Sequence, residues 1–339
     1  RTSLALDKTD SLVDIYRVAR ETHFKVLVLQ IIQKIGFKVL VKAGLVLIGG
    51  LLVLNQEMNI GQFVAAEILI LLVIASVEKL IMGLESFYDV LTSLEKLGQV
   101  VDKELEHQGG EKSFKETENF TVELSNVSYK VPERKRKIID DISLTITPNC
   151  RVLLQGVNGS GKATLLRLIA GIAEPSEGEI YINDVSLKGL HLNYYRSHLG
   201  QSLSEESPFE GTLLENITFG DTSVLKEDIY WAIEHTGLSK FLKEQPLGLN
   251  TMIYPEGKQI SFTIAKKIVL ARSIVRKPKL LILKDPLNQF DEGEADKIMK
   301  FLTLPENPWA LVVVSQNPRW AQLCGRVITL EKGKLISEI

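Results

Sequence analysis

The sequence predicts two unlike halves: membrane-spanning helices followed by an α/β domain with a phosphate-binding loop. Three observations predict this fold class. Residues 31–80 are far more apolar than anything that follows them. Beyond residue 110, short β-branched runs alternate with helical stretches, as in α/β domains. A glycine-rich turn joins one of these strands to a helix. At 339 residues, the chain is long enough for two hydrophobic cores.

The apolar half contains two uncharged runs, residues 43–54 (AGLVLIGGLLVL) and 68–77 (ILILLVIASV). Neither run reaches the roughly 20 apolar residues of a spanning helix. Both are apolar on all sides, however, and the polar turn NQEMNIGQ lies between them, which favours a hairpin through a bilayer with helices over about 31–54 and 60–80. Two buried helices of a soluble domain are the alternative. Glu67 either faces a bundle interior or a wet cavity, or lies near the membrane boundary.

An amphipathic pattern over residues 81–108 predicts one helix that leaves the membrane and ends near the two glycines at 109–110. We therefore expect a helical domain over 1–110 and an α/β domain over 116–339. The sequence begins directly in a helix-like stretch, with neither an initiating Met nor a signal peptide, so we expect a fragment.

Composition excludes some classes of partner and site. The formal net charge of -2 comes from mixed signs along the chain and argues against a nucleic-acid partner. Cys150 and Cys324 form no spaced cluster, so neither a disulfide framework nor a zinc site is indicated. A reducing compartment fits this cysteine usage.

The sharpest local signal follows the strand RVLLQ at residues 151–155. Glycines let backbone amides turn toward a phosphate chain, the helix dipole favours its negative charge, and a lysine reaches the outer phosphates. A serine or threonine hydroxyl normally follows that lysine and binds magnesium; here the residue is alanine, and the next residue is turned by about 100° along the helix. The predicted nucleotide-binding residues are Gly156, Asn158, Gly159, Ser160, Gly161, Lys162, Ala163 and Thr164.

Further segments occur in a recognisable order: EPSEGEIYIND (174–184), PFEGTLLENITFGD (208–221) and the stretch 255–287. With the membrane half, they resemble an ABC exporter half-transporter of the haemolysin-secretion type along nearly the whole chain. The resemblance implies all-α transmembrane helices followed by an α/β P-loop NTPase domain, the ABC-type ATP-binding cassette. It also implies a helical subdomain over about 205–275 and ATP as the ligand.

The resemblance exposes departures at positions where the family contacts nucleotide. The adenine-stacking aromatic corresponds to Val131, with Tyr129 as a possible substitute, and the glutamine that senses the γ-phosphate and metal corresponds to Ser204 or Glu205. The LSGGQ signature, which the opposite cassette presents to nucleotide, retains only its serine. Its residues here are Ile260, Ser261, Phe262, Thr263 and Ile264.

The catalytic strand departs as well. The aspartate that orients magnesium is replaced by Lys284, a reversal of charge, and the general-base glutamate by Asp285, which stays a candidate base. The switch histidine is replaced by Gln316. Since Ala163 and Lys284 remove both expected protein contacts to magnesium, metal binding is in doubt and little turnover is expected. Lys284 would either pair with nucleotide phosphates in place of the metal or form a salt bridge to Asp285.

Three functions therefore compete. The first is an active exporter with unusual catalytic residues. The second is a degenerate half that works with a competent partner or by binding alone, and the third is a membrane-anchored regulator or scaffold. The resemblance implies a second half-transporter, as homodimer or heterodimer, and a peptide or protein substrate. It also implies an inner or plasma membrane location with the cassette in the cytoplasm.

Overall fold

The computed structural model describes residues 3–103, 105–106, 109–111, 120–131, 136–203 and 206–338, without the side chains of residues 3–5, 82 and 85. The chain divides into two compact units, Arg1–Leu105 and Glu106–Ile339. The first unit is a pair of helices and the second combines helices with sheets. The fold class predicted from the sequence is therefore confirmed.

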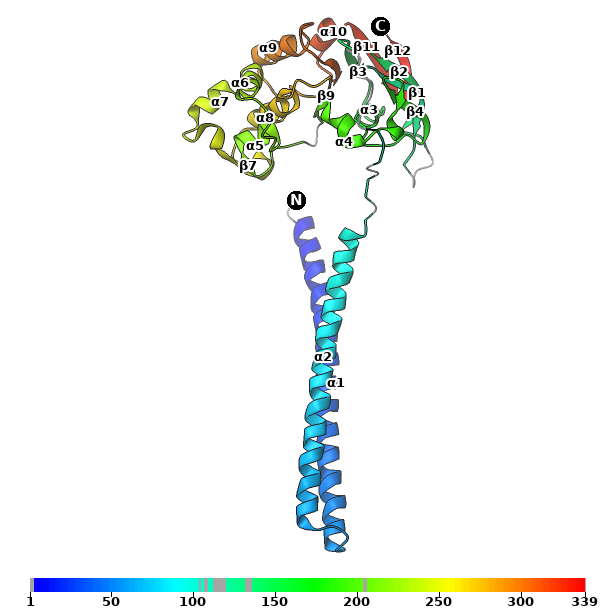
Figure 1. Ribbon diagram of the computed structural model, residues 1–339, viewed down its shortest axis with the longest axis vertical. Coiled ribbons are helices and arrows are strands. Elements are labelled where there is room, and N and C mark those ends of the chain that lie inside the picture. The colour runs from blue at the N-terminus through cyan, green and yellow to red at the C-terminus, as the bar shows by residue number, and fades with distance from the viewer. Residues whose placement is uncertain are drawn as a thin grey trace. The chain divides into compact units, whose positions relative to one another are not determined.

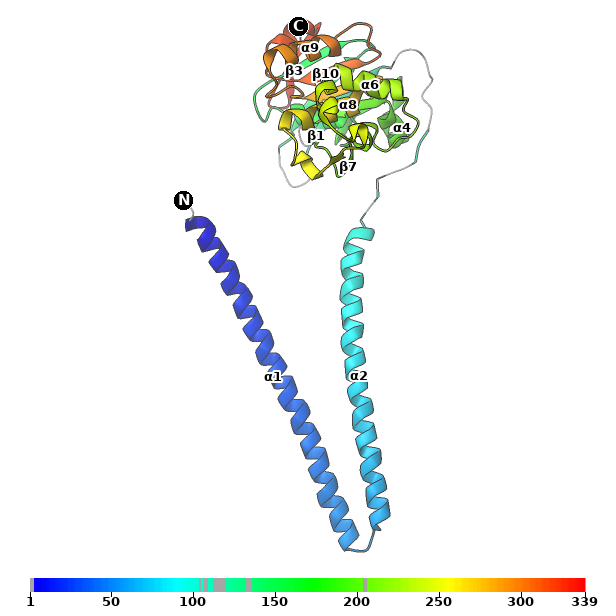
Figure 2. The same cartoon turned by 90° about the vertical axis from the view of Figure 1, so that its left-hand side faces the viewer.

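The first unit is a helical hairpin, and Figure 2 shows its two helices meeting at one end. Helix α1 (Ser3–Leu54) and helix α2 (Ile60–Val101) are both long and apolar enough to cross a membrane. Asn59 starts α2 with a reciprocal capping box, in which its side chain accepts from Gln62 N while Gln62 Oε1 accepts from Asn59 N. Helix α2 ends at Val101 rather than near residue 108, and Asp102 caps it with its N–H donating to Gly98 O at 2.8 Å.

Opposite charges join the two helices far from the hairpin turn. Glu78 Oε1 lies 3.4 Å from Lys34 Nζ and 2.5 Å from Lys38 Nζ. At 1.5 Å per residue, Lys38 and Glu78 lie roughly 24–27 Å along their helices from the turn, close to the ~30 Å thickness of a hydrocarbon core. A charged pair is therefore placed where a bilayer around the turn-proximal segment would end. Glu67 is half-buried, and its role stays a prediction.

Three sheets form the framework of the second unit (Figure 1). An antiparallel sheet has the order β2-β1-β4-β5, a mainly parallel sheet has the order β12-β11-β3-β10-β9-β6, and β7 pairs with β8. The strands are β1 (Val122–Tyr129), β2 (Ile139–Ile146), β3 (Arg151–Gln155), β4 (Glu177–Ile182), β5 (Val185–Ser186), β6 (Leu199–Ser202), β7 (Gly211–Thr212), β8 (Met252–Ile253), β9 (Leu280–Lys284), β10 (Ala310–Val314), β11 (Arg326–Glu331) and β12 (Lys334–Glu338).

Helices cover the parallel sheet, and Figure 1 shows α5 to α8 gathered away from the antiparallel strands. The helices of this unit are α3 (Lys162–Ile169), α4 (Leu192–Ser197), α5 (Leu213–Thr218), α6 (Lys226–His235), α7 (Ser239–Glu244), α8 (Phe262–Ile274), α9 (Glu292–Leu302) and α10 (Arg319–Leu323). Short 3₁₀ turns are η1 (Leu187–Gly189), η2 (Gly248–Asn250) and η3 (Pro255–Gly257).

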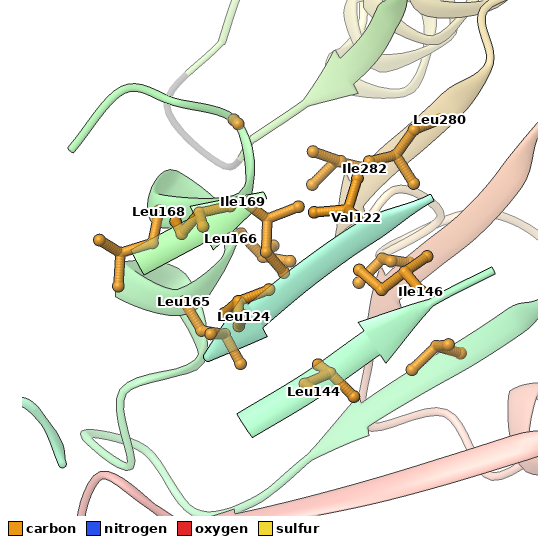
Figure 3. Packing of buried hydrophobic residues seen from close by; sticks show 14 of the residues in the cluster. Val122, Leu124, Leu144, Ile146, Leu165, Leu166, Leu168, Ile169, Leu280 and Ile282 are labelled. Carbon is orange, nitrogen blue, oxygen red and sulfur yellow. The ribbon is translucent and has the colours of Figure 1, made fainter. Parts of the chain in front are cut away.

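The parallel sheet is buried on both faces, which explains why its central strands read as unbroken apolar runs. In β3, Val152 and Leu154 face one core cluster, and Leu153 faces the other. The first cluster holds α3 against β1 and β2, as Figure 3 shows with Leu165 beside Leu124. This packing fixes the start of α3, and therefore the glycine-rich loop, against the end of β3.

Candidate nucleotide-binding site

The site lies where three parallel strands end side by side. Val314 of β10 is in register with Leu154 of β3 on one side and with Lys284 of β9 on the other. The segments after these strands therefore reach the same edge of the sheet: the glycine-rich loop, Asp285 and Gln316. In open α/β sheets, this carboxyl edge is where ligands bind.

Two glycines shape the loop because only glycine fits their positions. Gly156 has φ 143°, and a Cβ there would lie 2.2 Å from Leu330 O. Gly161 caps α3 with φ 106°, and a Cβ there would lie 2.9 Å from Ile138 O. Between them, Gly159 also has a positive φ of 82°, with nothing within 4 Å of its Cβ position. The loop thus turns tightly against β11 and the start of β2, while its middle stays open toward the cavity.

Lys162, the first residue of α3, is held inside the loop. Its Nζ donates to Gly156 O at 2.6 Å, to Val157 O at 2.9 Å and to Ser160 Oγ at 3.3 Å. Burial lowers the pKa of Lys162, and the nearby Asp285 carboxylate opposes this shift. The ammonium group is thus positioned by the same carbonyls that define the loop, at the N-terminus of the helix.

A cavity of about 680 Å³ opens over this loop. Most sequence-predicted residues of the loop and the catalytic strand line this cavity. Gly156 does not line it, and lies instead against Leu330 of β11. Sequence reasoning missed the lining residues Arg136, Lys137, Ile138 and Lys332; the basic run ERKRK at 133–137 was the available signal. The lining consists of residues 157–164, together with Arg136, Lys137, Ile138, Lys284, Asp285, Val314, Gln316 and Lys332.

The described lining is strongly cationic: it contains five basic side chains and one carboxylate, for a net formal charge of +4. Two of the basic groups are partly neutralised, because Lys137 pairs with Glu177 at 2.6 Å and Lys332 lies 3.9 Å from Glu331. The other three are Arg136, Lys162 and Lys284, and none of them forms an ion pair with another described residue. The positive charge of these three side chains is therefore available to attract an anionic ligand in the cavity.

Asp285 is the acidic group of this lining. It directly follows β9 in a left-handed conformation (φ 45°), with its N–H donating to Val314 O at 2.8 Å. Burial raises the pKa of its carboxyl, while Lys284, Lys162 and Lys266 oppose the shift. No ion pair joins Asp285 to Lys284, although both residues are described, so the proposed salt bridge between them has no support.

These residues do not fit magnesium. Mg²⁺ needs hard oxygen ligands in octahedral geometry. Ala163 supplies no hydroxyl, Lys284 supplies a cation, and Asp285 is the one carboxylate among the described residues that line the cavity. The residues that the structure describes contain no group of three or more acidic, histidine or cysteine side chains able to hold a metal. The other predicted metal position, Ser204 or Glu205, lies outside the described residues.

The predicted adenine contacts lie elsewhere. Tyr129 is the last residue of β1 and packs against the hydrophobic core, and neither it nor Val131 lines the cavity. Tyr129 therefore does not line the cavity as a substitute stacking platform; its side chain is half-buried and packs against the first core cluster.

The signature segment also lies outside this cavity. Ser261 caps α8, with its Oγ accepting from Ile264 N at 3.3 Å. Phe262 is half exposed, and Lys266 Nζ lies 5.6 Å from the centre of its ring. Ile260 and Ile264 pack partly against the core, and Thr263 is half-buried beside them. Phe262 thus presents a bulky surface where the signature carries a glycine.

Fold and loop together define a nucleotide-binding domain of the P-loop class. Residues 139–288 match the ABC transporter family model. The chain is 26% identical over 318 residues to the alpha-hemolysin translocation ATP-binding protein HlyB of Escherichia coli, covering 93% of this chain and 45% of that protein. It is 27% identical over 316 residues to the exotoxin translocation ATP-binding protein PaxB of Pasteurella aerogenes, covering 92% of this chain and 44% of that protein.

A solved structure of a bacterial Atm1-family ABC exporter with ATP bound shares the fold, with a TM-score of 0.72, 18% identity, and coverage of 83% of this chain and 49% of that one. Residues 139–288 thus form an ABC transporter domain, and the similarity to these exporters confirms the resemblance drawn from the segment order. It spans less than half the length of these relatives.

Proposed function

We propose that this chain is the C-terminal part of an ABC exporter subunit that binds ATP at the glycine-rich loop and turns it over weakly or not at all. The observation that carries the proposal is a complete phosphate cradle, ending in Lys162, in a cavity whose magnesium positions hold Ala163 and Lys284. The two apolar helices support a membrane location, and the similarity to ABC exporters supports the inner or plasma membrane with the cassette on the cytoplasmic side.

Weak turnover follows from the chemistry of phosphoryl transfer. Hydrolysis needs a metal to neutralise developing charge and a base to position water. Loss of one preorganised catalytic group commonly costs about a hundredfold or more in rate. Here the metal contacts are replaced, and the base candidate Asp285 is one methylene shorter than the family's glutamate.

A second half-transporter is part of the proposal, because the cavity contains no signature residue from this chain. Phe262 and Thr263 would face a nucleotide bound by the partner, and their side chains prevent the close backbone approach that glycines permit. Both composite sites would therefore be impaired in a homodimer. In a heterodimer, this chain would supply its altered signature, with Phe262 and Thr263, to the nucleotide site of the partner, even if that site kept its own metal ligands.

Export of a peptide or protein is the transport function we propose. The support is the similarity to relatives that are named for translocating hemolysin and exotoxin. Ligand binding without hydrolysis also suits a second function, a membrane-anchored regulator or scaffold, since the loop keeps its geometry while the metal positions are replaced.

The test is magnesium-dependent ATP turnover by the full-length dimer in vesicles, with ATP binding measured alongside. We expect binding with little turnover. The double variant Ala163→Ser, Lys284→Asp should raise turnover if the opposite face is competent, and should leave it unchanged in a regulator. Wild-type turnover at the level of an intact exporter would overturn the proposed weak hydrolysis.

Binding itself needs a matched control. Lys162→Ala should abolish ATP binding, because it removes the loop's ammonium group. Lys240→Ala removes the same charge at a side chain that is 89% exposed and far from the loop in sequence, so it should leave binding unchanged. No ATP binding by the wild-type protein, with or without magnesium, would refute the proposal.

A further inference from the structure

We infer that the site recognises its ligand by the phosphate chain alone: it takes metal-free polyphosphates, whether or not they carry a nucleobase, and magnesium weakens their binding. This inference rests on the nucleotide binding proposed above and specifies the chemical form of the ligand. It is carried by the charge of the cavity, the replaced metal positions and the composition of the lining.

The described lining of the cavity carries more positive than negative side chains. Arg136, Lys162 and Lys284 form no ion pair with another residue that the structure describes, and they share one cavity with a single carboxylate. Hydrogen bonds from a cationic group to a phosphate oxygen are roughly twice as strong as neutral ones. A polyanion would therefore offset the mutual repulsion of these three cations, of which Lys162 is already held by Gly156 O, Val157 O and Ser160 Oγ.

Magnesium lowers the negative charge that a polyphosphate ligand brings to the cavity. A nucleoside triphosphate carries about four negative charges at neutral pH and its magnesium complex about two, since the last phosphate ionisation lies near pH 6. The cavity offers magnesium no hydroxyl at Ala163 and a cation at Lys284. The metal therefore halves the ligand's charge without gaining a protein contact, and the protein and magnesium compete for the same phosphate oxygens.

Nucleotide-binding sites often hold the base by stacking it on an aromatic side chain, which strengthens binding by about tenfold or more. No aromatic side chain belongs to the described lining, and the neighbouring residues 132–135, outside the described part, are Pro, Glu, Arg and Lys. Tyr129 is used in core packing. The described lining thus has no stacking platform that would favour a nucleotide over inorganic triphosphate, and stacking itself would not separate adenine from guanine, since every base has a π-face.

A neighbouring groove extends the same basic surface. Arg136, Lys137 and Lys332 line both the loop cavity and an adjoining cavity of about 500 Å³, where Lys334 adds another cation. Asp140 and Glu331 also line this groove and reduce its charge. A longer phosphate chain can therefore meet further cations, so affinity should rise from pyrophosphate to triphosphate to tetraphosphate.

The experiment titrates the full-length protein with ATP, GTP and inorganic triphosphate at constant ionic strength, in EDTA and in excess magnesium. We expect the three affinities in EDTA to agree within about threefold, since a stacking platform would separate the two nucleotides from inorganic triphosphate by about tenfold or more. Magnesium should weaken each of them. Lys284→Asp should reverse the magnesium effect, and Lys240→Ala should reproduce the wild-type pattern.

The outcomes separate this inference from the proposed function. Binding of ATP that is about tenfold or more tighter than that of inorganic triphosphate, a difference of about 1.4 kcal/mol, would overturn base indifference while leaving ATP binding intact. Stronger binding in magnesium would overturn the metal-free ligand in the same way. Failure of every ligand to bind a folded protein would overturn both proposals.

Discussion

Removing the ammonium group of Lys284 tests the electrostatic account of the site most directly. Lys284 ends β9, is half-buried, and lines the cavity with Lys162 and Asp285. Its replacement by Ala lowers the net formal charge of the lining from +4 to +3. One charge-assisted hydrogen bond is worth about 1.5–3 kcal/mol, and partial exposure favours the lower end, so affinity for metal-free ATP should fall about tenfold.

The assay is equilibrium binding of ATP in EDTA at two salt concentrations, with Lys240→Ala as the charge-matched control. Because the lost interaction is electrostatic, the difference between Lys284→Ala and wild type should shrink as salt rises. Unchanged affinity at low salt, together with an unchanged melting temperature, would refute a phosphate-binding role for Lys284.

Three further outcomes follow from the same geometry. Asp285→Asn should strengthen the binding of metal-free ATP and abolish any residual turnover. Because burial raises the pKa of the Asp285 carboxyl, the affinity of the wild-type protein for ATP should increase as pH falls through that pKa and the carboxylate loses its charge. This pH dependence should vanish in the variant, as titration in EDTA would show. Arg151→Ala should lower the free energy of unfolding by about 3 kcal/mol in denaturant melts, since the guanidinium is 8% exposed and donates to Trp309 O and Leu304 O at 2.7 Å each. Gly156→Ala should abolish nucleotide binding, because its Cβ would clash with Leu330 O. Gly159→Ala has open space at its Cβ position, so it should weaken the folded loop by only about 1–2 kcal/mol, the cost of a left-handed backbone for alanine. Equal loss of binding in the two variants would contradict the loop geometry.

Local residue patterns were enough to predict the fold class and the glycine-rich loop. The apolar runs 43–54 and 68–77 lie within α1 and α2, and the strand RVLLQ is β3. The end of α2 was predicted too late, because the polar run after Val101 contains a single apolar residue, Leu105, and so gives the amphipathic pattern no clear end. The basic lining residues Arg136 and Lys332 were missed because they are distant in sequence and meet only when β2 and β11 flank the loop.

By itself, the sequence determined the chemistry available to this protein: a phosphate loop with Lys162, and Ala163 and Lys284 at positions where magnesium contacts would stand. Only the tertiary structure decided where those groups point. The parallel register of β3, β10 and β9 brings Lys284 and Asp285 to the loop, whereas packing against the core withdraws Tyr129 from it. The physical reason is that residue type fixes charge and hydrogen-bonding capacity locally, whereas a cavity's net charge depends on which distant strands end at the same sheet edge.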